Sequence, residues 1–149
     1  MTGGGAARKI ATACGNRMPR SGRGHVAWGM SDFRRLTVWQ RAHQAALETH
    51  RATMAFSVGH SAWLAVRMRR VAASVAASIA EGCGGAAPRD EARCLQVAAG
   101  SARELQYFAL LAHDLGLLPE DLQSRVEELA VETQRMLGAL LRRVPRPHR

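Results

Sequence analysis

The sequence is poor in aromatic residues, cysteine and long apolar segments. Aromatic residues make up only 5% of the chain, so a hydrophobic core must consist of aliphatic and small side chains. Three widely spaced cysteines, Cys14, Cys83 and Cys94, exclude a disulfide framework and favour the reducing cytoplasm. The longest strongly apolar segment without a charge, residues 71–80, is far shorter than the roughly 18 residues of a membrane span. We therefore expect a soluble, cytoplasmic protein that has no membrane partner.

Basic residues outnumber acidic ones, and the excess lies entirely at the two ends of the chain. The formal net charge is +9, with five basic residues and no acid in residues 1–29 and four arginines in residues 142–149. Residues 30–141 hold 12 arginines and 12 acids, so this segment is neutral. Its front part, residues 32–80, is basic and its rear part, residues 81–141, is acidic, which predicts attraction between the two within one bundle or between subunits.

The basic N-terminal segment differs in composition from the rest of the chain. Residues 1–31 are rich in glycine and arginine and show no apolar period, so we expect a disordered extension. Met30 stands directly before the organised segment and is an alternative start of the natural protein, while the apolar residues 10–14 are too few for a signal peptide. We expect one domain at residues 32–144, followed by a basic tail at residues 145–149.

Apolar residues recur at steps of three and four in two segments of the front half, which predicts two helices. The first helix begins after Thr37, which would form a capping box with Gln40, and ends within residues 57–60. Its expected core stripe consists of Trp39, Ala42, Ala46, Thr49, Thr53 and Phe56. The second helix spans about 61–81 and ends at Gly82, a residue suited to a left-handed C-cap. Its many small side chains predict that it is the most buried helix.

Two further helices are predicted in the rear half. Pro88 suits the first position of the third helix, which stops at Gly116. Pro119 starts the fourth helix and Pro145 ends it. The expected core stripes are Leu95, Ala98, Ala102, Leu105, Ala109 and Ala112, and then Leu122, Val126, Leu129, Thr133, Met136, Leu140 and Val144. Four helices with short loops predict an all-α fold, an antiparallel up-down-up-down four-helix bundle.

A polar stripe runs along the second helix at steps of three and four. It consists of Arg67, Arg70, Ser74, Ser78 and Glu81. The stripe is either a solvated face or a structural network of Arg70, Ser74, Glu81 and Glu104. In that network Arg70 or Glu81 would pair across the bundle or across a subunit interface, with Glu104 and Arg103 of the third helix as candidate partners. A buried charge without a partner costs on the order of several kcal/mol. An inward stripe therefore requires pairing, and Arg70→Ala would then destabilise the protein strongly.

No arrangement of catalytic or metal-binding residues is evident. A di-iron bundle needs Glu-x-x-His on two helices, and no glutamate here has a histidine three residues later. His43 and His50 lie one heptad apart without further ligands, so we expect both at the surface. Cys83 follows a helix C-terminus, where the dipole disfavours a thiolate, and Cys94 is expected to fill the core. We expect no enzyme activity, no cofactor and no metal.

Six arginines of the front half are candidates for phosphate contact. They are Arg34, Arg35, Arg41, Arg67, Arg69 and Arg70. The alternative is that they are ordinary surface charges, balanced by the acids of the rear half. Aromatic residues that would stack on bases are few, because Trp39 is expected in the core and Trp63 near the start of the second helix.

Five short segments resemble, in order, the four-helix bundle protein family. That family includes proteins encoded in intervening sequences of bacterial 23S ribosomal RNA genes and is related to the accessory variability determinant of diversity-generating retroelements. The matching segments are LTVWQRAH at 36–43, RR at 69–70, SIAEG at 78–82, GSARELQY at 100–107 and DLGLL at 114–118. The resemblance covers roughly residues 32–143, and five segments in the same order make it more specific than any one of them.

The resemblance implies an up-down-up-down bundle that assembles as a ring-like homopentamer and has no enzyme activity. For the retroelement relatives it also implies a basic surface that engages nucleic acid and a reverse transcriptase. The loop at residues 83–87, usually basic in the family, is uncharged here, which weakens the nucleic-acid inference. We expect a homo-oligomeric binding or scaffold protein with RNA or DNA as a candidate partner. The alternative is an accessory subunit of a reverse-transcriptase complex.

Overall fold

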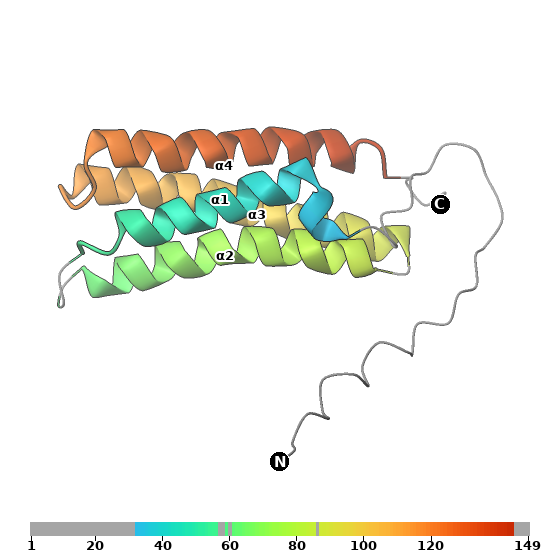
Figure 1. The fold of residues 1–149 in the computed structure, drawn as a ribbon, viewed down its shortest axis with the longest axis horizontal. Helices are drawn as coiled ribbons and strands as arrows, with labels where there is room; N and C mark the ends of the chain where they lie inside the picture. The colour runs from blue at the N-terminus through green and yellow to red at the C-terminus, as the bar shows by residue number, and fades with distance from the viewer. Residues whose placement is uncertain (1–31, 57–58, 60, 86, 145–149) are drawn as a thin grey trace, which may run out of the picture.

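The four predicted helices are all present, preceded by one short 3-10 helix (Figure 1). The elements are η2 (Phe33–Arg35), α1 (Thr37–Ala52), α2 (Ala62–Gly84), α3 (Pro88–Asp114) and α4 (Glu120–Leu141). No strand occurs in the part of the chain that the structure describes. The predicted all-α class is confirmed.

The computed structural model describes most of the expected domain. The described residues are 32–56, 59, 61–85 and 87–144. The predicted N-terminal extension at 1–31 and the predicted tail at 145–149 lie outside them.

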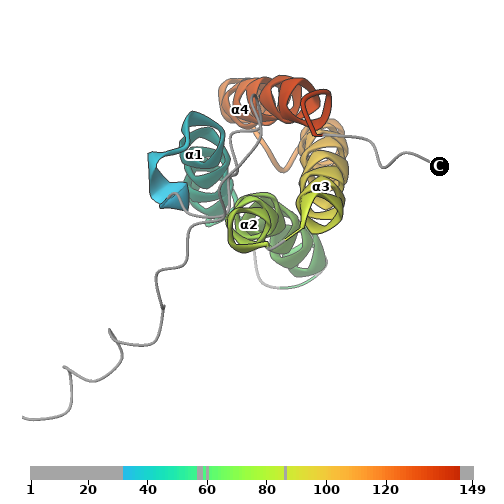
Figure 2. The ribbon, with the colours of Figure 1, turned by 90° about the vertical axis from the view of Figure 1, so that its right-hand side faces the viewer.

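Consecutive helices run antiparallel and lie side by side (Figure 1). Seen from one end, the four helices occupy the corners of a square (Figure 2). Both α1 and α3 contact α2 and α4, whereas neither diagonal pair is in contact over the described ranges. The contact between α2 and α3 is the most extensive. This arrangement is the predicted up-down-up-down four-helix bundle.

Two hydrophobic clusters fill the bundle, one toward each end, and all four helices contribute to both. Leu64, Met68 and Leu105 belong to the cluster that contains the C-terminal end of α1, and Ile79 and Leu137 to the other. Burying one such side chain contributes roughly 1.5–3 kcal/mol. The buried apolar residues are almost all aliphatic or small, as the scarcity of aromatic residues predicts.

The core stripe predicted for α3 is correct throughout, whereas those predicted for α1 and α4 are only partly correct. Trp39 and Ala46 in the first and five of the seven members of the second are only partly buried. In α1 the prediction omits the buried Val38, Ala45 and Ala52, and in α4 it omits the buried Ala130 and Leu137. Each helix of a square bundle faces two neighbours, so its buried face is broader than one heptad stripe.

The capping box predicted at the start of α1 is wrong. The N-cap is Leu36, and no side chain caps the helix. The 3-10 helix η2 ends directly before it, and the Gln40 amide donates a hydrogen bond to the Arg34 carbonyl oxygen at 3.0 Å. Asp32 caps η2 instead, because its carboxylate accepts a hydrogen bond from the Arg34 N–H at 3.1 Å. The side chain of Gln40 therefore fastens η2 to α1.

Gly82 does not end α2 in a left-handed conformation, contrary to the prediction. The helix continues to Gly84, and its C-cap, Gly85, has a φ of −67°. A Cβ on Gly82 would lie 3.1 Å from the Cβ of Cys94 on α3. The absence of a side chain at Gly82 therefore favours close approach of the two helices. Helix α2 buries more residues than any other described helix, as predicted from its small side chains.

The remaining helix boundaries agree better with those predicted from the sequence. Helix α3 begins at Pro88 and ends two residues before Gly116, whose φ of +71° fits the predicted glycine stop. The Gly116 N–H donates a hydrogen bond to the His113 carbonyl oxygen at 2.8 Å. Helix α4 starts directly after Pro119 but ends at Leu141, before the predicted Pro145.

Gly82→Ala and Gly100→Ala form a matched pair that tests the close approach of α2 and α3. Gly100 is also helical, but a Cβ there would meet nothing within 4 Å. Gly100→Ala should raise the free energy of unfolding by roughly 0.5–1 kcal/mol through helix propensity alone. Gly82→Ala should lower it by about 1 kcal/mol, because α3 must move away from the new methyl group. Urea unfolding followed by circular dichroism measures both, and equal stabilisation would contradict the role given to Gly82.

Candidate interaction surfaces

Three pairs of polar side chains bridge the outer edge between α2 and α3. They are Arg67–Glu104 (Nε to Oε1, 3.0 Å), Ser74–Ser101 (Oγ to Oγ, 3.2 Å) and Glu81–Arg93 (Oε1 to Nη2, 3.4 Å). The charged members are substantially exposed, so each ion pair contributes only about 0–1 kcal/mol. The polar stripe predicted on the second helix thus lies along this edge, and only Ser78 of its five members is buried.

The structure does not bring Arg70, Ser74, Glu81 and Glu104 into one network. Glu104, the expected partner of Arg70, pairs with Arg67 instead. Arg70 is exposed, and no ion pair involves it among the described residues. Because its charge remains in water, Arg70 carries no burial cost that a partner would have to offset.

Four of the six arginines proposed for phosphate contact have partners inside the chain. These contacts are Arg34–Asp32 (2.8 Å), Arg41–Glu132 (3.1 Å), Arg67–Glu104 and Arg69–Thr53 (2.8 Å). Arg35 and Arg70 are exposed and have no ion-pair partner in the described ranges. Arg41 lies at the α1–α4 edge and Arg67 at the α2–α3 edge, on opposite sides of the bundle (Figure 2). The six arginines therefore do not form one continuous surface.

Two of these ion pairs join the basic front part to the acidic rear part. Arg41 reaches Glu132 on α4, and Arg67 reaches Glu104 on α3. The attraction expected between the two parts of the chain thus operates within one bundle.

At the start of the domain, hydrogen bonds from Arg34 lower the pKa of Asp32, so this carboxylate stays ionised at neutral pH.

Arg69 has a structural role at the end of α1. Its Nε donates a hydrogen bond to Thr53 Oγ1 at 2.8 Å, and its Nη2 donates one to the Thr53 carbonyl oxygen at 3.1 Å. Thr53 follows the last residue of α1, where unpaired carbonyl groups and the negative end of the helix dipole favour a cation. Arg69 is therefore committed to joining α2 to α1.

The two cysteines of the bundle are buried free thiols. Burial, and to a lesser extent the charge of Glu91, raises the pKa of Cys83 to about 11. Burial, followed by the charge of Glu81, also raises the pKa of Cys94. Both thiols are therefore protonated at neutral pH and are poor nucleophiles. Cys94 fills the core as predicted, and Cys83 lies in the last turn of α2, not in a loop.

Neither a metal cluster nor a membrane-spanning helix is found in the described residues. No group of three or more His, Cys, Asp or Glu side chains lies close enough together there to hold a metal ion. No helix there is both long and apolar enough to cross a membrane.

His43 is exposed and stacks on the half-buried ring of Trp39, with ring centroids 4.8 Å apart.

Three exposed apolar residues, which the sequence analysis did not predict, lie near the start of α2 and in the second half of α3. We name Trp63, Val66 and Tyr107 the α2–α3 apolar surface; their exposed fractions are 55%, 63% and 59%. Arg67 connects the two helices here, because its guanidinium pairs with Glu104 and lies 5.6 Å from the ring centroid of Phe108, next to Tyr107. Trp63 lies in the first turn of α2, near the helix start where it was expected, and its side chain is exposed.

Arg67→Ala and Arg70→Ala should differ in their effect on stability. Arg70→Ala should change the free energy of unfolding by less than about 0.5 kcal/mol, because it removes no described ion pair. Arg67→Ala should cost roughly 1 kcal/mol, since it loses both the pair with Glu104 and the contact with the Phe108 ring. Thermal and urea unfolding would measure both, and a larger cost for Arg70→Ala would show that it has a partner outside the described residues.

Comparison with known proteins gives one family. The family model of the 23S rRNA-intervening sequence protein matches residues 34–139, a segment that contains α1, α2 and α3 and nearly all of α4. A search of curated proteins found no significant match. The relation to retroelement proteins stays a prediction. Since the family model covers most of the chain, the protein belongs to the 23S rRNA-intervening sequence protein family.

Proposed function

We propose that the protein is a homo-oligomeric binding or scaffold protein that acts without catalysing a reaction. The observation that carries the proposal is the α2–α3 apolar surface. Two large aromatic side chains and a valine are more than half exposed on the neighbouring helices α2 and α3, and Leu110 of α3 is 50% exposed as well. Exposed aromatic residues beside an arginine are typical of protein interfaces, where such residues carry much of the binding energy.

A second copy of the chain is the partner that we propose for this surface. The family resemblance implies a ring of identical subunits, and each subunit of a ring needs one surface for each neighbour. The α2–α3 apolar surface would be one of the two. Arg67 and Glu104, both partly exposed beside it, would form the polar rim of such an interface.

The described bundle does not favour a nucleic-acid partner over a protein partner. Of the six candidate arginines only Arg35 and Arg70 lack described ion pairs or hydrogen bonds that would compete with phosphate. The excess positive charge of the chain belongs to residues 1–29 and 142–149. No observation on the described residues favours an accessory role in a reverse-transcriptase complex.

The oligomeric state of the full chain tests the proposal. Size-exclusion chromatography with light scattering should give a mass several times that of the monomer at micromolar concentration. Trp63→Ser combined with Tyr107→Ser should raise the dissociation constant by roughly a hundredfold or more, because buried aromatic residues dominate interface energies.

Leu47→Ser is the matched control, because Leu47 is an exposed apolar residue of α1, a helix that contributes nothing to the α2–α3 apolar surface. It should leave the mass unchanged. A wild-type chain that is monomeric at these concentrations, or a double variant with unchanged mass, would exclude this surface as the site of assembly.

A further inference from the structure

The outer face of α4 has a charge pattern that no ion pair among the described residues explains, and the one side-chain hydrogen bond that they make to it joins the Gln123 amide to Glu127 on the same helix. One stripe of residues at steps of three and four follows this face for the whole length of the helix. Its members are Glu120, Ser124, Glu127, Val131, Arg135, Gly138 and Arg142. Five of the seven are exposed, and Val131, at its centre, is an exposed apolar residue with an exposed fraction of 36%. We name these seven residues the α4 stripe.

The charges of the α4 stripe are separated by sign. Glu120 and Glu127 lie before Val131, and Arg135 and Arg142 lie after it. None of the four takes part in an ion pair with a described residue. The helix dipole favours acids in the first turn and bases in the last, but this effect fades within one turn. It does not account for Glu127 and Arg135, which lie in the middle of the helix.

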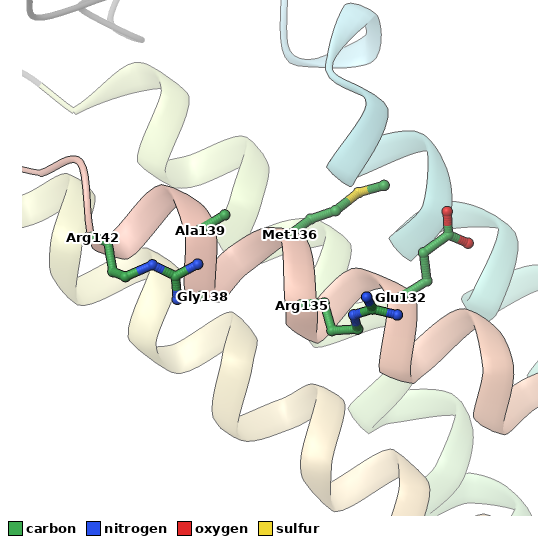
Figure 3. A pocket seen from close by; sticks show the side chains of 6 residues that line it. All are labelled: Glu132, Arg135, Met136, Gly138, Ala139 and Arg142. Atoms are coloured by element: carbon green, nitrogen blue, oxygen red, sulfur yellow. The ribbon is translucent and has the colours of Figure 1, made fainter.

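The basic half of the stripe contains an open hollow (Figure 3). Arg135 and Arg142 lie on either side of Gly138 and Ala139 along the helix, and Glu132 points toward α1, where it pairs with Arg41. A Cβ on Gly138 would meet only the end of the flexible Arg142 side chain, at 3.6 Å. The backbone of a second helix could therefore approach α4 closely at this point.

We infer that the α4 stripe is a docking surface for the α4 stripe of a second copy of the chain, with the two helices antiparallel. Val131 would lie on the two-fold axis. Glu127 and Arg135 are equally spaced from Val131, as are Glu120 and Arg142, so the antiparallel register places each acid opposite an arginine of the other copy. Each ion pair then occurs twice.

Charge complementarity selects this occupant. A parallel, in-register arrangement would set each charge against the same charge of the other copy. A partner of one sign, whether acidic or basic, would be attracted by one half of the stripe and repelled by the other. In the antiparallel register Ser124 lies opposite Gly138, so a small side chain faces the hollow.

The contact should be weak and strongly dependent on salt. Its apolar part is limited to Val131, Ala139 and the side-chain stems, so the ion pairs provide much of the attraction. Exposed ion pairs are screened at high ionic strength, where the Debye length falls to about 3 Å at 1 M salt. The contact is separate from the α2–α3 apolar surface and does not require it.

Sedimentation equilibrium of the full chain with Trp63→Ser and Tyr107→Ser tests the inference apart from the proposed function. This double variant, which serves as the background for all further changes, should show a monomer–dimer equilibrium at low salt that is lost at 1 M salt. Adding Glu120→Arg and Glu127→Arg gives an all-basic stripe, and adding Arg135→Glu and Arg142→Glu gives an all-acidic one. Each chain alone should associate at least roughly tenfold more weakly than the background, and an equimolar mixture should form a heterodimer.

Arg125→Glu with Arg143→Glu is the matched control, because it changes the net charge as the all-acidic variant does but lies off the stripe. It should keep the dimer. A background that stays monomeric at several hundred micromolar protein and low salt would overturn the inference. It would also be overturned if the all-basic and the all-acidic variant each dimerised alone but did not dimerise with each other. Circular dichroism checks that every variant is folded. If the background keeps the wild-type mass, the proposed α2–α3 assembly fails, while the mixing experiment still tests α4.

Discussion

The close contact between α2 and α3 is the interaction on which the rest of the structure depends. It is the most extensive helix contact, and Gly82 favours close packing because a Cβ there would lie only 3.1 Å from the Cβ of Cys94. Elsewhere along the same pair of helices, Ser74 and Ser101 come within hydrogen-bonding distance, and Arg67 reaches Glu104. Helices that approach closely gain dispersion contacts along their whole length. The same packing fixes the α2–α3 apolar surface, since its members belong to both helices.

Much of the fold could be predicted because the sequence is locally consistent. The stripe of α3 is correct throughout, since small and aliphatic residues alternate there with polar ones over many turns. Gly116 stops α3 as expected, because a positive φ is a local property. The roles of Gly82 and Gln40 could not be predicted, since each depends on a contact with another element. Cys94 belongs to a different helix, and the Arg34 carbonyl belongs to η2.

The candidate surfaces were harder to predict than the fold, because charges can be counted in a sequence but not paired. Arg67 and Arg70 are indistinguishable by helical spacing, yet one bridges two helices and the other is exposed to water. Arg69 resembles a phosphate-binding residue until Thr53 is seen beside it. Trp63 and Tyr107 carried a usable signal. Tyr107 lies off the core stripe of α3, and a large aromatic residue off a core stripe is exposed unless another element covers it.

The two proposed surfaces differ in the symmetry that they can support. A ring needs two different surfaces on each subunit, and the α2–α3 apolar surface would serve as one of them. The α4 stripe is complementary to itself, and a two-fold contact occupies that stripe on both copies at once. Helices α2 and α4 stand at diagonal corners, so the two surfaces need not compete. A two-fold axis perpendicular to the axis of a ring would pair it with a second ring, and such an assembly is closed and cannot grow into a filament.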